Sequence, residues 1–210
     1  MKVVSLILAR GGSKGIKNKN IKHLCGKPLI SYSIETSKKS QVNETWVSTD
    51  DAKIKSIALE NNSRVIDRPD EFATDISPSE DSLIHFAENV DFDILVFLQP
   101  TSPLIKYSDI DNALKLIGQY DSIFSAYENH WLPRWTKDID TINWDITKRP
   151  RRQDIALEYV ENGAIYITKK ECLLKSRLRY SGKIGIYKMP FSKSFQIDTN
   201  DDLLLMEKII

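Results

Sequence analysis

The sequence predicts a single α/β domain in which helices cover both faces of a mostly parallel β-sheet. Short apolar segments alternate with amphipathic helical patterns along most of the chain, an order typical of parallel strands joined by helices. One of these segments, residues 94–98, reads ILVFL without interruption, which is typical of a strand buried on both faces. A chain of 210 residues with 41% hydrophobic content fits one compact domain, so we treat residues 1–210 as one unit.

The first elements follow from apolar runs and the residues that bound them. Residues 3–8 form an apolar run, and a helix is expected from about Pro28 because proline suits the first turn of a helix. A short strand at 45–48 precedes a helix at 51–60, whose apolar residues recur on one helical face. A third strand, 64–66, ends shortly before a proline, which cannot continue a buried strand.

The alternation continues on both sides of the central strand. The helix at 79–89 has apolar residues spaced for one buried face, and it leads into that strand. A further helix at 109–118 leads to a strand at 122–126. After a long interruption, regular structure returns as strands at 164–168 and 184–188 and a closing helix at 200–210.

Periodicity fails between residues 129 and 158. This segment holds Trp131, Trp135 and Trp144, three of the four tryptophans of the chain, together with two prolines. Aromatic residues without a periodic core face are typical of a surface that packs on a partner or covers a ligand. We therefore expect residues 129–158 to form a protruding arm that makes a homodimer; a lid over the chain's own site is the alternative.

The N-terminal segment carries a local excess of positive charge. The first thirty-four residues contain seven cations and no acid, although the whole chain has a net charge of only +1. The cations interleave with glycines directly after the first strand, and ligands of open α/β sheets bind at that edge. Glycines let the backbone turn tightly and bring N–H groups close to an anion. The pattern predicts a phosphate site rather than a solvated basic loop, but not a Walker A loop or a dinucleotide fingerprint, whose spacings it lacks.

The composition argues against several classes of function. A nearly neutral chain lacks the extended basic face that general nucleic-acid binding needs. No apolar run has the length of a membrane span, and no signal-peptide pattern precedes the first strand, so we expect a cytoplasmic protein that does not bind membranes. Cys25 and Cys172 are too few for a disulfide framework or a structural zinc site.

Seven motifs, taken in order, give the chain a resemblance to a known family. They are ARGGSKGIKNKNI, STDD, DRPDEFATD, LQPTSPL, RPRRQ, ENGAIYI and QIDTNDDL. Over essentially its whole length the chain resembles the acylneuraminate cytidylyltransferases. The resemblance implies a three-layer α/β/α fold of the Rossmann-like nucleotidyltransferase type, a Mg²⁺ cofactor and a homodimer. It also implies transfer from CTP to an acidic 2-keto-3-deoxy sugar of the sialic, legionaminic or pseudaminic type, with pyrophosphate as the second product; a Kdo-like acid is the alternative acceptor.

In the family that the chain resembles, the basic loop holds the triphosphate of CTP. The CTP-binding roles then fall on Arg10, Gly11, Gly12, Ser13, Lys14, Lys19, Asn20, Arg68 and Ser79. Arg10 and Lys14 are the expected catalytic cations, because attack on the α-phosphate builds negative charge that such groups stabilise. Arg68 and Ser79 match positions that read the cytosine. The alternatives are a strand-end salt bridge for Arg68 and a helix cap for Ser79.

The resemblance places the acceptor sugar and the metal on later segments. The sugar-binding candidates are Gln99, Arg152, Asn162 and Gln196. Gln99 follows the central strand, where an amide can both donate to and accept from a polyol. An arginine suits the sugar carboxylate, and Arg149 and Arg151 compete for that role. Asp198 is the expected Mg²⁺ ligand and a catalytic residue. The pattern acid-Ile-Asp, which we associate with sialic acid enzymes, is broken by Gln196, so any support from that acid for a second metal is weakened, replaced or moved.

Two other classes of function stay as alternatives. A glycosyltransferase that consumes nucleotide sugars also begins with a nucleotide-binding α/β half, but the middle of this chain lacks an acid-x-acid metal motif. A non-catalytic nucleotide-binding protein is suggested by Gln196 and by the aromatic arm. Release of pyrophosphate from CTP separates the first prediction from both alternatives.

Overall fold

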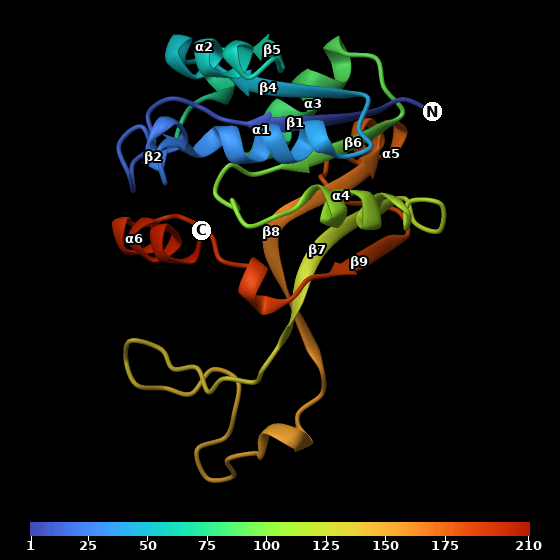
Figure 1. The fold of residues 1–210 in the computed structure, drawn as a ribbon. Helices are drawn as coiled ribbons and strands as arrows, with labels where there is room; N and C mark the ends of the chain where they lie inside the picture. The colour runs from blue at the N-terminus through green and yellow to red at the C-terminus, as the bar shows by residue number, and fades with distance from the viewer.

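A seven-stranded sheet lies at the centre of the structure, a computed structural model that describes residues 1–210 (Figure 1). Its strands are β1 (Val3–Leu8), β4 (Glu44–Thr49), β5 (Arg64–Asp67), β6 (Ile94–Leu98), β7 (Ser122–Asn129), β8 (Glu158–Lys169) and β9 (Ile184–Lys188). They are ordered β5-β4-β1-β6-β8-β7-β9, and every neighbouring pair is parallel except the two that β8 makes with β6 and β7. The predicted, mostly parallel sheet is therefore confirmed.

Helices pack on both faces of this sheet, which confirms the three-layer arrangement. The helices are α1 (Leu29–Lys39), α2 (Ala52–Glu60), α3 (Ser79–Asn89), α4 (Tyr107–Leu114), α5 (Lys170–Ser176) and α6 (Asn200–Ile209). Apolar side chains of α1, α2 and α4 form one core cluster with the sheet, and those of α3 and α5 form a second on its other face. Helix α6 packs with α1 and with the hairpin formed by β2 (His23–Leu24) and β3 (Lys27–Pro28).

Strand β1 shows how the sequence builds both layers. Val3 and Ile7 belong to the core on the α1 side, and Val4 and Leu6 to the core on the α3 side. Successive side chains of a strand point to opposite faces, so a continuous apolar run suits a strand covered on both sides. Burial of this run fixes β1 in the middle of the sheet, and the basic segment therefore begins at its carboxyl edge.

The structure departs from the predicted elements at several places. Helix α5 and the β2–β3 hairpin were not predicted, and β8 extends over twelve residues instead of five. Helix α4 begins at Tyr107 rather than at residue 109, because the Asp109 carboxylate accepts a hydrogen bond from the Lys106 N–H at 2.8 Å and so stands in the first turn. It ends at Leu114, and turns lead on to β7.

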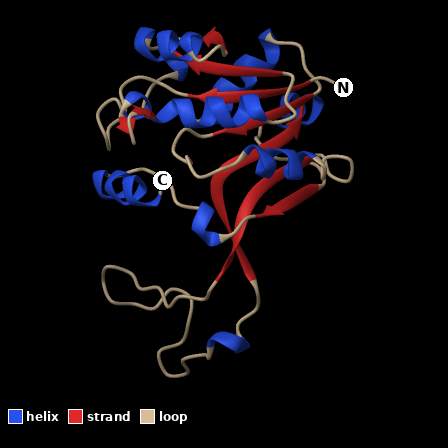
Figure 2. Cartoon of the chain, viewed as in Figure 1, coloured by secondary structure: helices blue, strands red, loops and turns tan.

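Residues 130–157 form an arm that projects from the ends of β7 and β8, almost entirely as loop (Figure 2). No residue of this segment is buried. Trp135 and Trp144 pack edge to face at 5.1 Å, and the Arg149 guanidinium lies 5.3 Å from the Trp144 ring. Ile139 and Ile146 remain 78% and 66% exposed. The arm thus has a small aromatic cluster but no core of its own.

None of the helices combines the length and the apolar character that crossing a membrane requires.

Candidate active site

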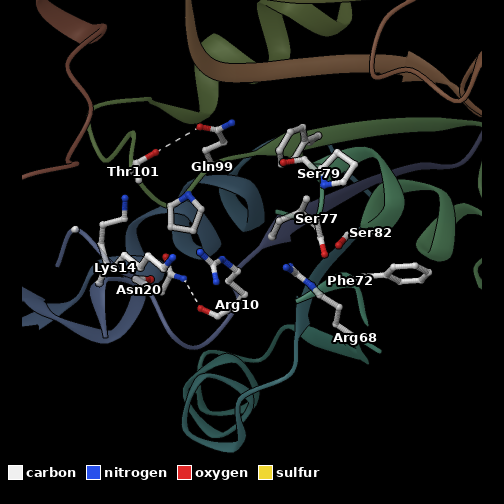
Figure 3. Close-up of a pocket in the computed structure, with 17 residues that line it drawn as sticks. Arg10, Lys14, Asn20, Arg68, Phe72, Ser77, Ser79, Ser82, Gln99 and Thr101 are labelled. Atoms are coloured by element: carbon white, nitrogen blue, oxygen red, sulfur yellow. Dashed lines mark hydrogen bonds between the residues drawn. The ribbon is translucent and has the colours of Figure 1, made fainter. Parts of the chain in front are cut away.

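A polar cavity of about 360 Å³ lies at the carboxyl ends of β1, β5 and β6 (Figure 3). Arg10, Arg68 and Gln99 follow these three strands and reach the cavity from them. Of the seventeen residues that line it, three are hydrophobic. Strand ends of a parallel sheet are the usual ligand site of such folds, and a polar lining suits a charged ligand.

The cavity brings together predicted residues that are far apart in the sequence. Those that line it are Arg10, Ser13, Lys14, Lys19, Asn20, Arg68, Ser79 and Gln99. Seven of them carry predicted contacts to CTP, and Gln99 carries a predicted contact to the acceptor. The structure therefore places these predicted CTP residues and a predicted acceptor residue in one cavity.

Three cations of the basic loop, Arg10, Lys14 and Lys19, are each held by an acid. The Arg10 Nη2 and Lys14 Nζ atoms lie 2.7 Å from the two carboxylate oxygens of Asp75, one on each oxygen. Lys19 Nζ lies 2.8 Å from Oδ1 of Asp198. Hydrogen bonds from Lys14 and Arg10 lower the pKa of Asp75, so its carboxylate is charged at neutral pH. The cations are thus held around the cavity by residues from two distant segments.

Of the three glycines in the basic loop, Gly15 lines the cavity, whereas Gly11 and Gly12 do not. The Gly11 N–H donates to Oδ1 of Asp50 at 2.9 Å, so it points away from the predicted phosphate position. Gly12 adopts a φ of +64°, a conformation that favours glycine. Asn20 is buried and donates from Nδ2 to the Arg10 carbonyl at 3.0 Å, which ties the two ends of the loop together.

Arg68 is a buried cation without an acidic partner. Its side chain is 7% exposed and donates from Nε and Nη2 to the hydroxyl and the carbonyl of Ser48, at 3.1 and 2.8 Å. Burial lowers its pKa to about 10, and the nearby Arg10 adds to this effect while Asp50 opposes it. The strand-end salt bridge considered as the alternative for Arg68 is therefore wrong. At neutral pH the cavity wall still holds this positive charge, and no carboxylate forms an ion pair with it.

The opposite wall is formed by the start of α3 and the end of β6. Ser79 is the first residue of α3, but Pro78 occupies the N-cap and no side-chain cap bond forms, so the helix-cap alternative for Ser79 is wrong. The next residue, Glu80, makes a two-point ion pair with Arg179, at 2.6 and 3.0 Å. The Arg179 guanidinium lies 5.8 Å from the ring of Phe97, which lines the cavity. The partly buried ion pair between Glu80 and Arg179 thus packs against this wall.

Asn162, a predicted sugar contact, faces the protein interior. It is 4% exposed, and its amide oxygen accepts from the Ser125 hydroxyl at 2.6 Å. Its amide nitrogen donates to the Ser194 hydroxyl at 2.9 Å. The structure shows a residue that joins β7, β8 and the segment before α6, and Asn162 does not line the cavity.

Gln196 and Gln99 meet at Gly163. The Gln196 amide nitrogen donates to the carbonyl of Asn162, a bond that a carboxylate at this position would not make. A Cβ atom on Gly163 would lie 2.1 Å from that nitrogen and 3.2 Å from Oε1 of Gln99, so a side chain at this position would displace the Gln196 amide. The glutamine pair therefore extends the polar surface beyond the cavity.

Arg152 lies outside the cavity of its own chain. It is an exposed residue of the arm, and its guanidinium contacts the ring of His130. Within one chain, the structure does not bring this predicted sugar ligand to the other site residues.

Asp198, the predicted Mg²⁺ ligand, lies next to the cavity, where it forms an ion pair with Lys19. Its side chain is 63% exposed and reaches the cavity through its contact with Lys19. Its carbonyl oxygen would lie 2.7 Å from a Cβ on Gly15, so the glycine allows the two segments to approach. No group of three or more metal-binding side chains is present. Mg²⁺ often uses one or two carboxylates together with substrate phosphates and water, so a lone Asp198 fits this chemistry.

Sequence reasoning missed several residues of the cavity. They are Leu8, Phe72, Ser77, Pro78, Ser82, Phe97, Pro100 and Thr101. Pro100 and Thr101 belong to the motif LQPTSPL, and Phe72 belongs to DRPDEFATD, so motif membership was the available signal. Asp75 ends the latter motif, but nothing in its local sequence indicates that it meets Arg10 and Lys14.

Comparison with known proteins identifies similar chains. Residues 4–209 match the cytidylyltransferase family profile. N-acylneuraminate cytidylyltransferase A of Danio rerio is 38% identical over 98% of this chain, and the enzyme of Streptococcus agalactiae is 35% identical over 97%. This chain spans 50% and 52% of those two proteins. CMP-N,N'-diacetyllegionaminic acid synthase of Legionella pneumophila is 32% identical, with 100% of this chain and 97% of that protein covered.

Solved structures support the fold. A CMP:2-keto-3-deoxy-manno-octonic acid synthetase complexed with CTP superposes with a TM-score of 0.76 at 20% identity, covering 100% of this chain and 98% of that one. The 4-diphosphocytidyl-2C-methyl-D-erythritol synthase of Anaerococcus prevotii gives 0.73 at 11% identity, over 99% and 95% of the two chains. The overall fold of this chain is thus similar to that of these two solved structures.

Proposed function

Because the chain belongs to the cytidylyltransferase family, we propose that it activates a nonulosonic acid with CTP to give a CMP-sugar and pyrophosphate. The observation that carries the proposal is the cavity where the basic loop, Arg68 and Gln99 converge at one sheet edge. The names of its relatives, which include sialic acid and legionaminic acid enzymes, support this class of acceptor.

The basic loop is suited to the triphosphate. In the proposed reaction the C2 hydroxyl of the sugar acid attacks the α-phosphate. An O–P bond forms, the bond to the β-phosphate breaks, and the hydroxyl proton passes to solvent. Negative charge then grows on the α-phosphate oxygens and on the leaving pyrophosphate. Arg10, Lys14 and Lys19 are held by acids around the cavity and can stabilise that charge without large rearrangement.

The two ends of the cavity suggest an orientation for the substrates. We assign the cytosine to the wall made by Arg68, Ser79 and Phe97, where an unpaired guanidinium, a hydroxyl and an aromatic face are available. We assign the acceptor to the side of Gln99, which the Gln196 amide extends. The α-phosphate would then lie between the two, next to the basic loop.

Mg²⁺ is the proposed cofactor, and Asp198 would hold it together with the phosphates of CTP. When bound, the ion neutralises phosphate charge and favours departure of pyrophosphate. The side chain of Asp198 is exposed at the cavity edge, so a cation can reach it without unfolding the loop. Lys19 shares this carboxylate and would contact the same phosphates.

We propose that the arm pairs two chains. Leu132, Ile139, Ile142 and Ile146 are each more than half exposed, and no residue of 130–157 is buried. Such a surface is unfavourable in water and becomes favourable against a second copy. In the dimer Arg152 would serve the partner's cavity, where its fork-shaped guanidinium suits the sugar carboxylate. The cytoplasmic location expected from the sequence stays a prediction.

The reaction is tested by pyrophosphate release. Purified protein is incubated with CTP and Mg²⁺ and a panel of acids: N-acetylneuraminic, N,N'-diacetyllegionaminic, pseudaminic and Kdo. We expect release with one nonulosonic acid and formation of the matching CMP-sugar. Binding of CTP without release for any acid would favour a non-catalytic protein, and a requirement for a preformed CMP-sugar would favour a glycosyltransferase.

The dimer is tested by light scattering of the parent and of Ile142→Arg. We expect twice the chain mass for the parent and the mass of one chain, with reduced turnover, for the variant. Leu204→Arg, at an exposed position of α6, is the matched control and should stay dimeric. A fully active parent with the mass of one chain at micromolar concentration would instead favour an arm that acts as a lid.

A further inference from the structure

Asp75 is the one residue that contacts two cations of the basic loop. Its Oδ1 lies 2.7 Å from Nη2 of Arg10, and its Oδ2 lies 2.7 Å from Nζ of Lys14. The Ala73 carbonyl accepts a second hydrogen bond from Arg10, at 3.3 Å. The segment before α3 therefore makes three contacts with the basic loop, although more than fifty residues separate the two in the sequence.

From these contacts we propose that Asp75 is a positioning residue, which orients Arg10 and Lys14 for the triphosphate. The inference rests on the function proposed above and adds to it the group that sets the geometry of the phosphate-binding cations. A carboxylate has one oxygen for each cation, so a single side chain holds both. Both cations keep N–H donors available for phosphate, because a guanidinium and an ammonium carry more donors than these contacts use.

Lys14 shows why such a contact is needed. Its side chain is 75% exposed, and its ion pair with Asp75 is the contact that restrains the ammonium group. A long, exposed lysine would otherwise lose much conformational freedom when it binds a phosphate. Restraint in the free protein reduces that loss.

Asp75 itself stands on an ordered turn. The Ser77 N–H donates to the Thr74 hydroxyl at 3.1 Å, and the Ser77 hydroxyl donates to the Glu71 carbonyl at 2.7 Å. Ser77 and Ser79 line the same cavity as the cations. The Asp75 carboxylate therefore connects the basic loop with the segment before α3. Its loss should disturb phosphate binding without removing a side chain of the hydrophobic core.

A carboxylate on these cations also competes with phosphate for them, and this competition would weaken anion binding. The two effects have different signs and are separable by experiment. Removal of a competitor tightens anion binding, whereas removal of a positioning group weakens it. The loss of one negative charge favours anion binding in either case, so a control with the same charge change is required.

The experiment compares Asp75→Asn with Glu71→Gln, which removes the same charge from the same segment at an exposed side chain without a cation partner. Binding of inorganic triphosphate and of CTP is measured by calorimetry, and KM for CTP and kcat are measured by pyrophosphate release. We expect Asp75→Asn to weaken triphosphate binding and raise KM about tenfold relative to Glu71→Gln. Asp75→Glu should restore part of the loss. In a Lys14→Ala background the effect of Asp75→Asn should shrink, because one of its two targets is absent.

The outcomes separate the inference from the proposed function. Triphosphate binding by Asp75→Asn that equals or exceeds that of Glu71→Gln would overturn the positioning role while leaving the function intact. A parent that binds neither triphosphate nor CTP would overturn both. Because triphosphate binding needs no sugar and no turnover, an incorrect choice of acceptor does not affect this result.

Discussion

Replacing Arg68 with methionine tests whether the buried cation serves the fold or the ligand. Arg68 is 7% exposed, makes two hydrogen bonds to Ser48 and forms no ion pair with a carboxylate. If Arg68 is retained for stability, its replacement should lower the free energy of unfolding. If Arg68 is instead retained to bind the nucleotide, its burial should cost stability in the free protein, and its replacement should weaken nucleotide binding.

The magnitude follows from burial. The pKa of Arg68 falls to about 10, whereas the ordinary value is above about 12. One pKa unit corresponds to about 1.4 kcal/mol, so the charged form costs the folded protein about 3 kcal/mol relative to water. Arg68→Met removes this cost and two hydrogen bonds of about 1 kcal/mol each. The Ser48 carbonyl keeps its bond from the Ala9 N–H. The expected balance is an unfolding free energy higher by about 1 kcal/mol.

The assay combines urea unfolding with calorimetric binding of CTP. We expect slightly raised stability and CTP affinity reduced about ten- to one-hundredfold, the value of a charge-assisted hydrogen bond. Arg64→Met, on the exposed side of the same strand, should change stability by less than about 1 kcal/mol and leave CTP affinity unchanged. A loss of more than about 1 kcal/mol in Arg68→Met, with unchanged CTP affinity, would refute the reasoning.

The lowered pKa of Arg68 also predicts how the unfolding free energy changes with pH. The folded pKa of Arg68 lies below the unfolded one, so between the two values the unfolded chain binds more protons. The unfolding free energy of the parent should therefore rise as pH increases above about 10, relative to Arg68→Met, which lacks this titration. A difference between the two proteins that stays constant from neutral pH to pH of about 11 would show that Arg68 keeps its ordinary pKa.

Three further predictions concern the cations of the basic loop, the metal and the ion pair between Glu80 and Arg179. Arg10→Ala and Lys14→Ala should retain the fold and lose about a hundredfold in turnover, near 3 kcal/mol, because they stabilise charge in the transition state; near-normal rates in both would exclude the basic loop from the mechanism. Turnover should require a divalent cation, and Asp198→Asn should abolish it; a Mg²⁺ titration like that of the parent would place the metal elsewhere. Arg179→Met should lower the unfolding free energy by roughly 2 kcal/mol, because it leaves Glu80 half-buried without its partner. Burial raises the pKa of Glu80, but the Arg179 contacts outweigh it and lower the pKa. The stability that this ion pair contributes should therefore be present above about pH 4 and be lost as pH falls further. An unchanged dependence of stability on acidic pH in Arg179→Met would contradict this assignment.

The sequence by itself determined the elements whose signals lie within short windows. The apolar run of β1, the continuous core of β6 and the helix of α3 were predicted with their observed bounds, because hydrophobic periodicity is a local property. The basic segment was evident from charge alone. Its place at a sheet edge followed from the buried strand before it. The family was also readable from motifs in order.

The tertiary structure decided the contacts between distant segments. The contacts of Asp75 with Arg10 and Lys14 depend on how loops from different strand ends meet. The same is true of Arg68, which donates to Ser48 and forms no ion pair with a carboxylate. The inward orientation of Asn162 likewise depends on partners in β7 and in the segment before α6. Local sequence specifies which residues are buried along an element, but ion pairing and desolvation depend on neighbours that only the folded chain assembles.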